Sequence, residues 1–255
     1  MKKLSWFYKY FLFKLKKKNN IDLYFFDNNK SLDGLLNYFG SDKGTAVKNP
    51  YNKDSRKIFG HGFSKFYEKN FKHLREKKFN FLEIGTWEGA SLASFAKYFR
   101  NAQIYGLDRN FKFKYKSKRI NFLNCDTTDN NNLDKFKKNF KNKKFEIIID
   151  DGSHLLSDII HNLKFFSRFL KKGGYYVVED YNHPKYYNFL NNAKKELLFD
   201  KIIKKIKYKT LFSSSILGKI DQKFFHKNIK NIQTYKGLMK ESGRNISNIV
   251  FFEFK

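Results

Sequence analysis

The 255-residue sequence contains little cysteine, little proline and few acidic residues, and these shortages restrict what the protein can be. Cys125 is the only cysteine, so no intrachain disulfide can form, and a small secreted scaffold stapled by disulfides is excluded. The apolar stretch from Trp6 to Phe13 is interrupted by Lys9 and is too short to span a bilayer. We therefore expect a cytoplasmic protein in a reducing environment.

Acidic residues are so few that the chain is strongly basic. It has 24 Asp and Glu residues against 53 Lys and Arg residues, a formal net charge of +29, and the surplus is concentrated in residues 1–20 and 201–255. Such a charge favours an acidic partner: nucleic acid, an anionic membrane or a phosphorylated substrate. The many Lys, Asn, Phe, Ile and Tyr residues, with only two prolines, are equally what an A/T-rich coding sequence produces. Both interpretations stay open at this stage.

Residues 1–20 combine several aromatic residues with seven lysines and contain no acid. This composition is compatible with peripheral contact at the inner face of an anionic membrane, with contact to a partner protein, and with an ordinary packing helix.

From residue 79 onward, short apolar runs alternate with amphipathic stretches, which is typical of a parallel sheet covered by helices. The runs expected to form strands are Phe79 to Ile84, Gln103 to Leu107, Ile120 to Cys125, Phe145 to Ile149 and Tyr175 to Val178. The stretches expected to form helices are Ser91 to Phe99, Leu133 to Phe140 and Leu155 to Leu170, with Gly173 and Gly174 ending the last. Two further strands, Ile229 to Tyr235 and Asn248 to Phe254, are expected to pair antiparallel. We predict an α/β domain over residues 79–255, preceded by an N-terminal helical extension or lid over residues 1–78.

A glycine-containing loop, Glu83-Ile84-Gly85-Thr86-Trp87-Glu88-Gly89, lies where the first expected strand meets the next helix. Its glycines allow close approach to a ligand, although the Gly-x-x-x-Gly spacing does not fit the nicotinamide fingerprint. Asp108 ends the second strand, where an acid can accept both hydroxyls of a ribose, and Asp126 follows the third. Each feature alone is compatible with ordinary turn chemistry. In register at successive strand ends, they favour a nucleoside-bearing cofactor.

Acidic residues also follow the next two strands, as Asp150-Asp151-Gly152-Ser153-His154 and as Glu179-Asp180. Because neighbouring parallel strands end side by side, Asp151, Glu179 and Asp180 can converge. Their mutual repulsion is relieved by a hard divalent cation, and all-oxygen ligands favour Mg²⁺, with Mn²⁺ as the alternative. His154 is then close enough to act as a general base, although by itself it is equally a capping or packing residue.

This motif series resembles that of class I S-adenosylmethionine-dependent methyltransferases over about residues 79–182. The resemblance implies a Rossmann-like fold with a mostly parallel seven-stranded sheet and helices on both faces. It also implies that the glycine loop holds the methionine part of S-adenosyl-L-methionine, Asp108 the ribose and Asp126 the adenine. The cofactor contacts implied are Glu83, Gly85, Thr86, Gly89, Ser91, Asp108, Asp126 and Asp150, together with Lys43 and Gly44 from the segment before the core.

The acids with His154 closely resemble the metal-dependent sugar O-methyltransferases typified by the mycinamicin macrolide enzyme and its relatives from polysaccharide gene clusters. In that group the residues matching Asp151, Glu179 and Asp180 bind the metal, and the residue matching His154 is the base. Ser41-Asp42-Lys43-Gly44-Thr45, with His61-Gly62-Phe63 and Tyr67-Glu68, is similar to the segment preceding the core in these relatives. The similarity implies that Lys43 and Gly44 help to close over the cofactor or substrate; the alternative is an ordinary turn and helix.

We therefore expect methyl transfer to a sugar hydroxyl, within a nucleotide-activated sugar such as an NDP-hexose or NDP-heptose or another saccharide precursor of surface polysaccharide. No nucleic-acid partner is expected, and a homo-oligomer stays open. Two rival hypotheses are an RNA methyltransferase that uses the basic surface and a non-catalytic, membrane-associated partner protein. His183 follows the second acid pair, but we do not expect it to be a ligand.

Overall fold

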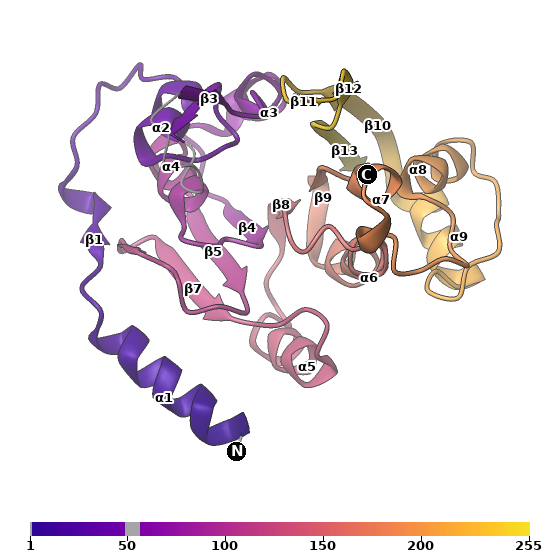
Figure 1. The fold of residues 1–255 in the computed structure, drawn as a ribbon, viewed down its shortest axis with the longest axis horizontal. Coiled ribbons are helices and arrows are strands. Elements are labelled where there is room, and N and C mark those ends of the chain that lie inside the picture. Colours follow the sequence, from indigo (N-terminus) through magenta and orange to yellow (C-terminus); the bar gives the residue numbers. More distant parts are fainter. Residues whose placement is uncertain (1, 49–56) are drawn as a thin grey trace.

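The computed structural model describes residues 2–48 and 57–255, and a seven-stranded sheet lies at its centre (Figure 1). The strands, in their order across the sheet, are β10 (Ile229–Lys236), β13 (Asn248–Phe254), β9 (Leu170–Glu179), β8 (Phe145–Asp150), β4 (Asn80–Ile84), β5 (Gln103–Asp108) and β7 (Ile120–Asn124). The pairs from β9 to β7 are parallel, whereas β13 pairs antiparallel with both β9 and β10. The predicted sheet and its antiparallel terminal pair are confirmed.

Helices cover both faces of the sheet (Figure 1). They are α1 (Lys2–Leu15), α2 (Leu32–Phe39), α3 (Ser64–Phe71), α4 (Ala90–Tyr98), α5 (Asn130–Asn139), α6 (Leu156–Phe166), α7 (His183–Tyr186), α8 (Phe199–Lys207) and α9 (Lys219–Asn228). Three short strand pairs accompany them: β1 (Asn19–Asn20) with β6 (Tyr115–Lys116), β2 (Ala46–Lys48) with β3 (Lys57–Phe59), and β11 (Lys240–Glu241) with β12 (Arg244–Asn245).

The side-chain alternation of the strands divides the hydrophobic core into two clusters. In β8, Ile148 belongs to the cluster that contains residues of α5, α6, α8 and α9, whereas Ile147 and Ile149 belong to the cluster that contains residues of α2, α3 and α4. Successive residues of a strand point to opposite faces, so a continuous apolar run is buried on both. This explains why the central strands could be recognised as uninterrupted apolar runs.

The chain between α6 and β9 differs from the prediction of a helix over Leu155 to Leu170. The helix ends at Phe166, a 3₁₀ turn follows over Ser167–Phe169, and Leu170 already pairs with Phe145 of β8. The register then shifts, because the next pair joins Ile147 to Tyr175 and the residues between bulge out of β9. The apolar spacing continues through Leu170, so periodicity alone could not show that pairing with β8 replaces the helix there.

The described residues before β4 share a core with the sheet. Leu35 and Leu36 of α2 and Phe71 of α3 are buried in the same cluster as Phe81 of β4. These helices therefore hold the intervening loop of residues 40–45 against the sheet. No helix within residues 2–48 or 57–255 is both long and apolar enough to cross a bilayer.

Parallel pairing also brings the carboxyl end of β4 into contact with β5 on one side and with β8 on the other. The Gly85 N–H donates to the carbonyl of Leu107 (2.8 Å), and the Asp151 N–H donates to the carbonyl of Ile84 (2.9 Å). Gly85 has φ +85°, and a Cβ atom there would lie 1.9 Å from the backbone oxygen of Asp151. Only glycine fits this position, so the loop after β4 is held directly against the acidic end of β8.

Candidate active site

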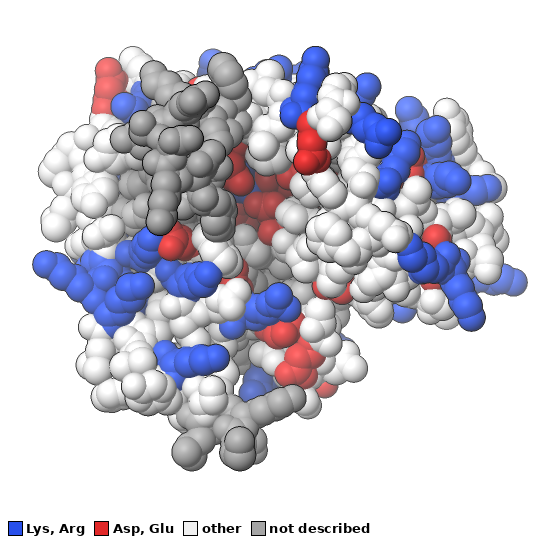
Figure 2. All heavy atoms as spheres, in the orientation of Figure 1, with Lys and Arg blue, Asp and Glu red and all other residues white. Residues whose placement is uncertain are grey.

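A cavity of about 300 Å³ lies at the carboxyl edge of the parallel strands. The loops that follow β4, β5, β7 and β8 line it, and they contribute Gly85, Asp108, Asp126, Asp151 and His154. The carboxyl ends of strands are where an open α/β sheet binds its ligands. Acidic side chains gather in a hollow near the centre of one face of the molecule, while basic side chains surround it (Figure 2).

Asp108 and Asp126 are oriented by hydrogen bonds from their own loops. Asp108 accepts from the backbone N–H groups of Trp87 (2.8 Å) and Asn110 (2.7 Å), and Asp126 accepts from the N–H (3.0 Å) and hydroxyl (2.7 Å) of Thr128. Both carboxylates line the cavity. The geometry brings together the two acids that the sequence assigns to ribose and adenine.

The other residues of the glycine loop have structural contacts of their own. Ser91 donates to the fully buried Glu83 (2.7 Å), and Gly89, at φ +88°, leaves space that the ring of Phe113 approaches. The hydroxyl of Thr86 is buried without a hydrogen-bond partner among the described residues.

The amine of Lys43 lies among three carboxylates contributed by different strands. It contacts Asp151, lies 2.7 Å from Glu179 and 3.6 Å from Glu83, and the residue is only 1% exposed. Burial alone would lower the pKa of Lys43, but the facing carboxylates hold it well above its usual value. Lys43 therefore stays cationic and compensates part of the buried negative charge.

One lysine does not neutralise three acids, and the remaining charge is balanced in other ways. Burial raises the pKa of Glu83 to about 7, despite the neighbouring Lys43 amine, and leaves one of its oxygens without a hydrogen-bond partner among the described residues. The hydroxyl of the buried Tyr67 donates to the second oxygen of Glu179. The cluster thus combines the cationic amine of Lys43, the Glu83 carboxyl with its raised pKa, and the neutral hydroxyl donor of Tyr67.

Asp180 lies beside this cluster among three histidines. Its carboxylate is 3.4 Å from Nδ1 of His61 and 3.8 Å from Nε2 of His183. Burial alone would lower the pKa of His61, but Asp180 raises it to about 9, whereas burial lowers the pKa of His183 to about 4. His154 and His183 each offer a nitrogen so placed that these atoms and an Asp180 oxygen lie within 4.8 Å of one another. His183 therefore does reach the site.

His154 is held in the cavity by an unusual backbone conformation. It has φ +57°, and its Nε2 lies 3.6 Å from Oδ1 of Asp151. The carboxylate of Asp151 therefore faces the imidazole ring. Asp151 thus faces Lys43 with one oxygen and His154 with the other.

Of the ten predicted cofactor residues, Gly85, Asp108 and Asp126 line the cavity, whereas seven do not: Glu83, Thr86, Gly89, Ser91, Asp150, Lys43 and Gly44. Asp150 accepts from Asn162 and from the Tyr176 hydroxyl, both at 3.2 Å, and burial raises its pKa to about 7. A Cβ atom on Gly44 would lie 2.2 Å from Oδ1 of Asn37, so Gly44 permits close packing of its loop on α2. The cofactor contacts of the seven residues outside the cavity lining stay predictions.

Sequence reasoning did not find the roles of Tyr67 and His61 in this site. Both belong to a segment flagged only by resemblance, and they reach Glu179 and Asp180 across more than 100 residues of sequence. The local sequence around these two residues does not reveal their distant partners.

Several known proteins to which this chain is similar are methyltransferases. Residues 82–181 match a family described as a methyltransferase domain. The chain is 33% identical over 131 residues to mycinamicin VI 2''-O-methyltransferase of Micromonospora griseorubida, covering 48% of this chain and 32% of that protein. It is 31% identical over 127 residues to demethylmacrocin O-methyltransferase of Streptomyces fradiae, covering 47% and 32%. The match thus spans about a third of the length of these curated relatives.

The fold is similar to that of a solved methyltransferase. MycE from the mycinamycin biosynthetic pathway, in complex with Mg, SAH and mycinamycin VI, aligns with a TM-score of 0.66 at 22% identity, covering 89% of this chain and 55% of that chain. The likeness shows the Rossmann-like methyltransferase fold. The expected resemblance to class I methyltransferases, and to the sugar O-methyltransferases among them, is confirmed.

Replacing Lys43 by methionine should strongly destabilise the fold. Lys43→Met removes the cation and leaves buried carboxylates uncompensated, so we expect a loss of about 3 kcal/mol in the free energy of unfolding. Urea unfolding at neutral pH measures this loss. Lys201→Met, which removes an exposed lysine of α8, is the matched control and should leave the midpoint unchanged. A Lys43→Met midpoint equal to that of the control would contradict the role given to Lys43.

Proposed function

We propose that this chain, whose residues 82–181 match a methyltransferase domain, is an S-adenosylmethionine-dependent and divalent-metal-dependent O-methyltransferase that acts on a sugar hydroxyl. The proposal rests on one juxtaposition. Asp108 and Asp126 line the same cavity as Asp151 and His154, so groups suited to a nucleoside adjoin groups suited to hydroxyl activation.

The cluster has the donor chemistry that a divalent cation requires. Asp151, Glu179 and Asp180 supply carboxylate oxygens from two neighbouring strand ends, and the Lys43 amine marks a position at which positive charge is already stabilised. Oxygen ligands of this kind suit Mg²⁺ or Mn²⁺. We propose that these three acids hold the metal.

When bound, S-adenosylmethionine supplies an electrophilic methyl group on a sulfonium, and the cation increases the acidity of a coordinated hydroxyl. The protein's own residues then orient and deprotonate the acceptor. Asp108 accepts hydrogen bonds from the ribose, and His154 takes the hydroxyl proton on Nε2. Asp151, 3.6 Å from that nitrogen, stabilises the resulting imidazolium. As the acceptor oxygen bonds to the methyl carbon, the carbon–sulfur bond breaks and its electron pair stays on sulfur.

The acceptor is proposed to be a nucleotide-activated sugar for surface polysaccharide. Two further curated relatives are named as O-methyltransferases of a rhamnosyl tetracenomycin and of an olivosyl oleandolide, which supports a sugar acceptor. The formal charge of +29 favours an acceptor that carries phosphate. A mass-spectrometric screen should detect a gain of one methyl group on an NDP-hexose or NDP-heptose; methylation confined to macrolide glycosides would contradict this assignment.

The base assignment predicts a separation of binding from turnover. His154→Ala should bind S-adenosylhomocysteine as the unchanged protein does, because His154 is not assigned to the cofactor, but turnover should fall by about 10²-fold or more. Calorimetry measures the first quantity and methyl transfer the second. His161→Ala, on the exposed face of α6, should affect neither. Undiminished turnover in His154→Ala would exclude it as the base.

Removal of the metal or of one of its ligands should have parallel effects. Chelation should abolish turnover, Mg²⁺ should restore it, and Asp151→Asn should lose both turnover and calorimetric Mg²⁺ binding, because a carboxylate ligand has become a neutral amide. Asp134→Asn, an exposed acid of α5, is the control and should behave like the unchanged protein. Full activity in excess chelator would refute the metal assignment.

A further inference from the structure

Helix α1 keeps a large apolar surface exposed although one of its faces is packed on the domain. Phe7, Phe11 and Leu15 recur at four-residue spacing and are 62%, 59% and 67% exposed, and Tyr8 beside them is 65% exposed. Scattered single apolar residues on a surface are ordinary, whereas a continuous stripe on one helix marks a contact site.

The opposite face of α1 is attached firmly to the sheet domain. Trp6 donates through its indole nitrogen to Asn124 (2.8 Å), and Phe13 is buried against Phe111 and Phe122, with ring centroids 5.4 and 5.3 Å away. The helix is therefore docked in a defined orientation, and whatever its outer stripe binds is oriented relative to the whole domain.

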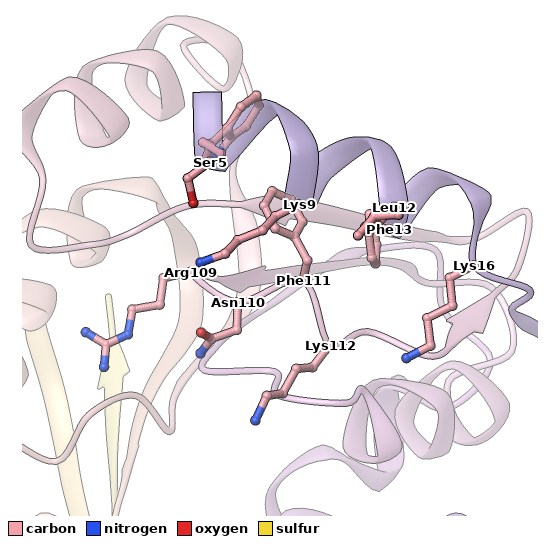
Figure 3. A pocket seen from close by; sticks show the side chains of 10 residues that line it. Ser5, Lys9, Leu12, Phe13, Lys16, Arg109, Asn110, Phe111 and Lys112 are labelled. Carbon is pink, nitrogen blue, oxygen red and sulfur yellow. The ribbon is translucent and has the colours of Figure 1, made fainter. Parts of the chain in front are cut away.

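Between α1 and the loop after β5 lies a groove of about 820 Å³ whose charged side chains are all basic. Lys9 and Lys16 of α1 and Arg109 and Lys112 of the loop lie along one side of the helix (Figure 3). In the described parts of the chain, no ion pair joins any of the four to an acid, although Lys112 lies 3.5 Å from the centroid of the Trp87 ring. Four uncompensated cations in one groove attract phosphate groups.

We propose that α1 and the loop of residues 109–112 form a surface that binds an anionic phospholipid membrane. An amphipathic helix with aromatic residues on one side and lysines beside them lies in the plane of a bilayer interface. The stripe of Phe7, Phe11 and Leu15 then enters the boundary between headgroups and acyl chains, while lipid phosphates contact the basic groove.

A soluble phosphate compound explains less of this surface. Arg109 and Asn110 line both the groove and the candidate active site, but Asp151 and His154 line only the latter. A nucleotide sugar seated in the groove would leave the stripe of Phe7, Phe11 and Leu15 uncovered. The membrane proposal accounts for charge and apolar exposure together, and it does not depend on the proposed reaction.

Flotation of the whole protein with vesicles tests the proposal. It should float with vesicles of phosphatidylcholine and phosphatidylglycerol, not with phosphatidylcholine alone, and added salt should weaken the association. Phe7→Ser/Phe11→Ser and Lys9→Glu/Lys16→Glu should each reduce binding by about tenfold or more. The control Lys201→Glu/Lys204→Glu makes the same charge change at two exposed lysines of α8 and should bind as the unchanged protein does.

Four outcomes would overturn the proposal. The first is the absence of flotation with anionic vesicles, and the second is an equal loss of binding in the α8 control, which would indicate net charge alone. The third is self-association in analytical ultracentrifugation that Phe7→Ser/Phe11→Ser abolishes while vesicle binding is absent, which would assign the stripe to a second copy of the chain. Calorimetric binding of UDP that Lys9→Glu/Lys16→Glu removes, again without flotation, would assign the groove to a soluble nucleotide.

Discussion

The structure depends on burying several carboxylates at one edge of a parallel sheet, and positive charge must accompany them. Lys43 supplies that charge by placing its amine between Asp151 and Glu179, with Glu83 nearby. Buried carboxylates without a counter-ion would oppose folding. The Lys43 amine favours the ionised form of the carboxylates that it faces, which is the form that binds a divalent cation. The same constraint thus links stability to the proposed chemistry, because a site that stabilises an ammonium group is suited to a divalent metal.

Three residues of the segment before the sheet belong to this site. Its residues Lys43, His61 and Tyr67 each contact an acid at a strand end, and helices α2 and α3 share the hydrophobic core with β4 and β8. Conversely, the acids tie the segment to the sheet. Lys43, His61 and Tyr67 therefore help to set the charge balance around the acids at these strand ends.

Sequence reasoning succeeded where local pattern determines structure. Buried apolar runs located the strands β4, β5, β8 and β9. The acids at the ends of β8 and β9 predicted that Asp151 and Glu179 converge, because parallel strands end together. It failed where a long-range contact decides the outcome. Nothing local shows that Lys43 enters the acid cluster 108 residues later in the chain, or that Leu170 pairs with β8 instead of continuing α6. The orientation of His183 toward Asp180 likewise depends on the turn after β9.

The central claim is that the acidic cluster is a divalent-metal site at the mouth of a nucleoside pocket. Anomalous diffraction from crystals grown with Mn²⁺ and S-adenosylhomocysteine tests it most directly. The account predicts an anomalous peak bonded to Asp151, Glu179 and Asp180, with the Lys43 amine withdrawn from its position between the first two. No peak at the cluster, with Lys43 still bridging Asp151 and Glu179, would contradict it.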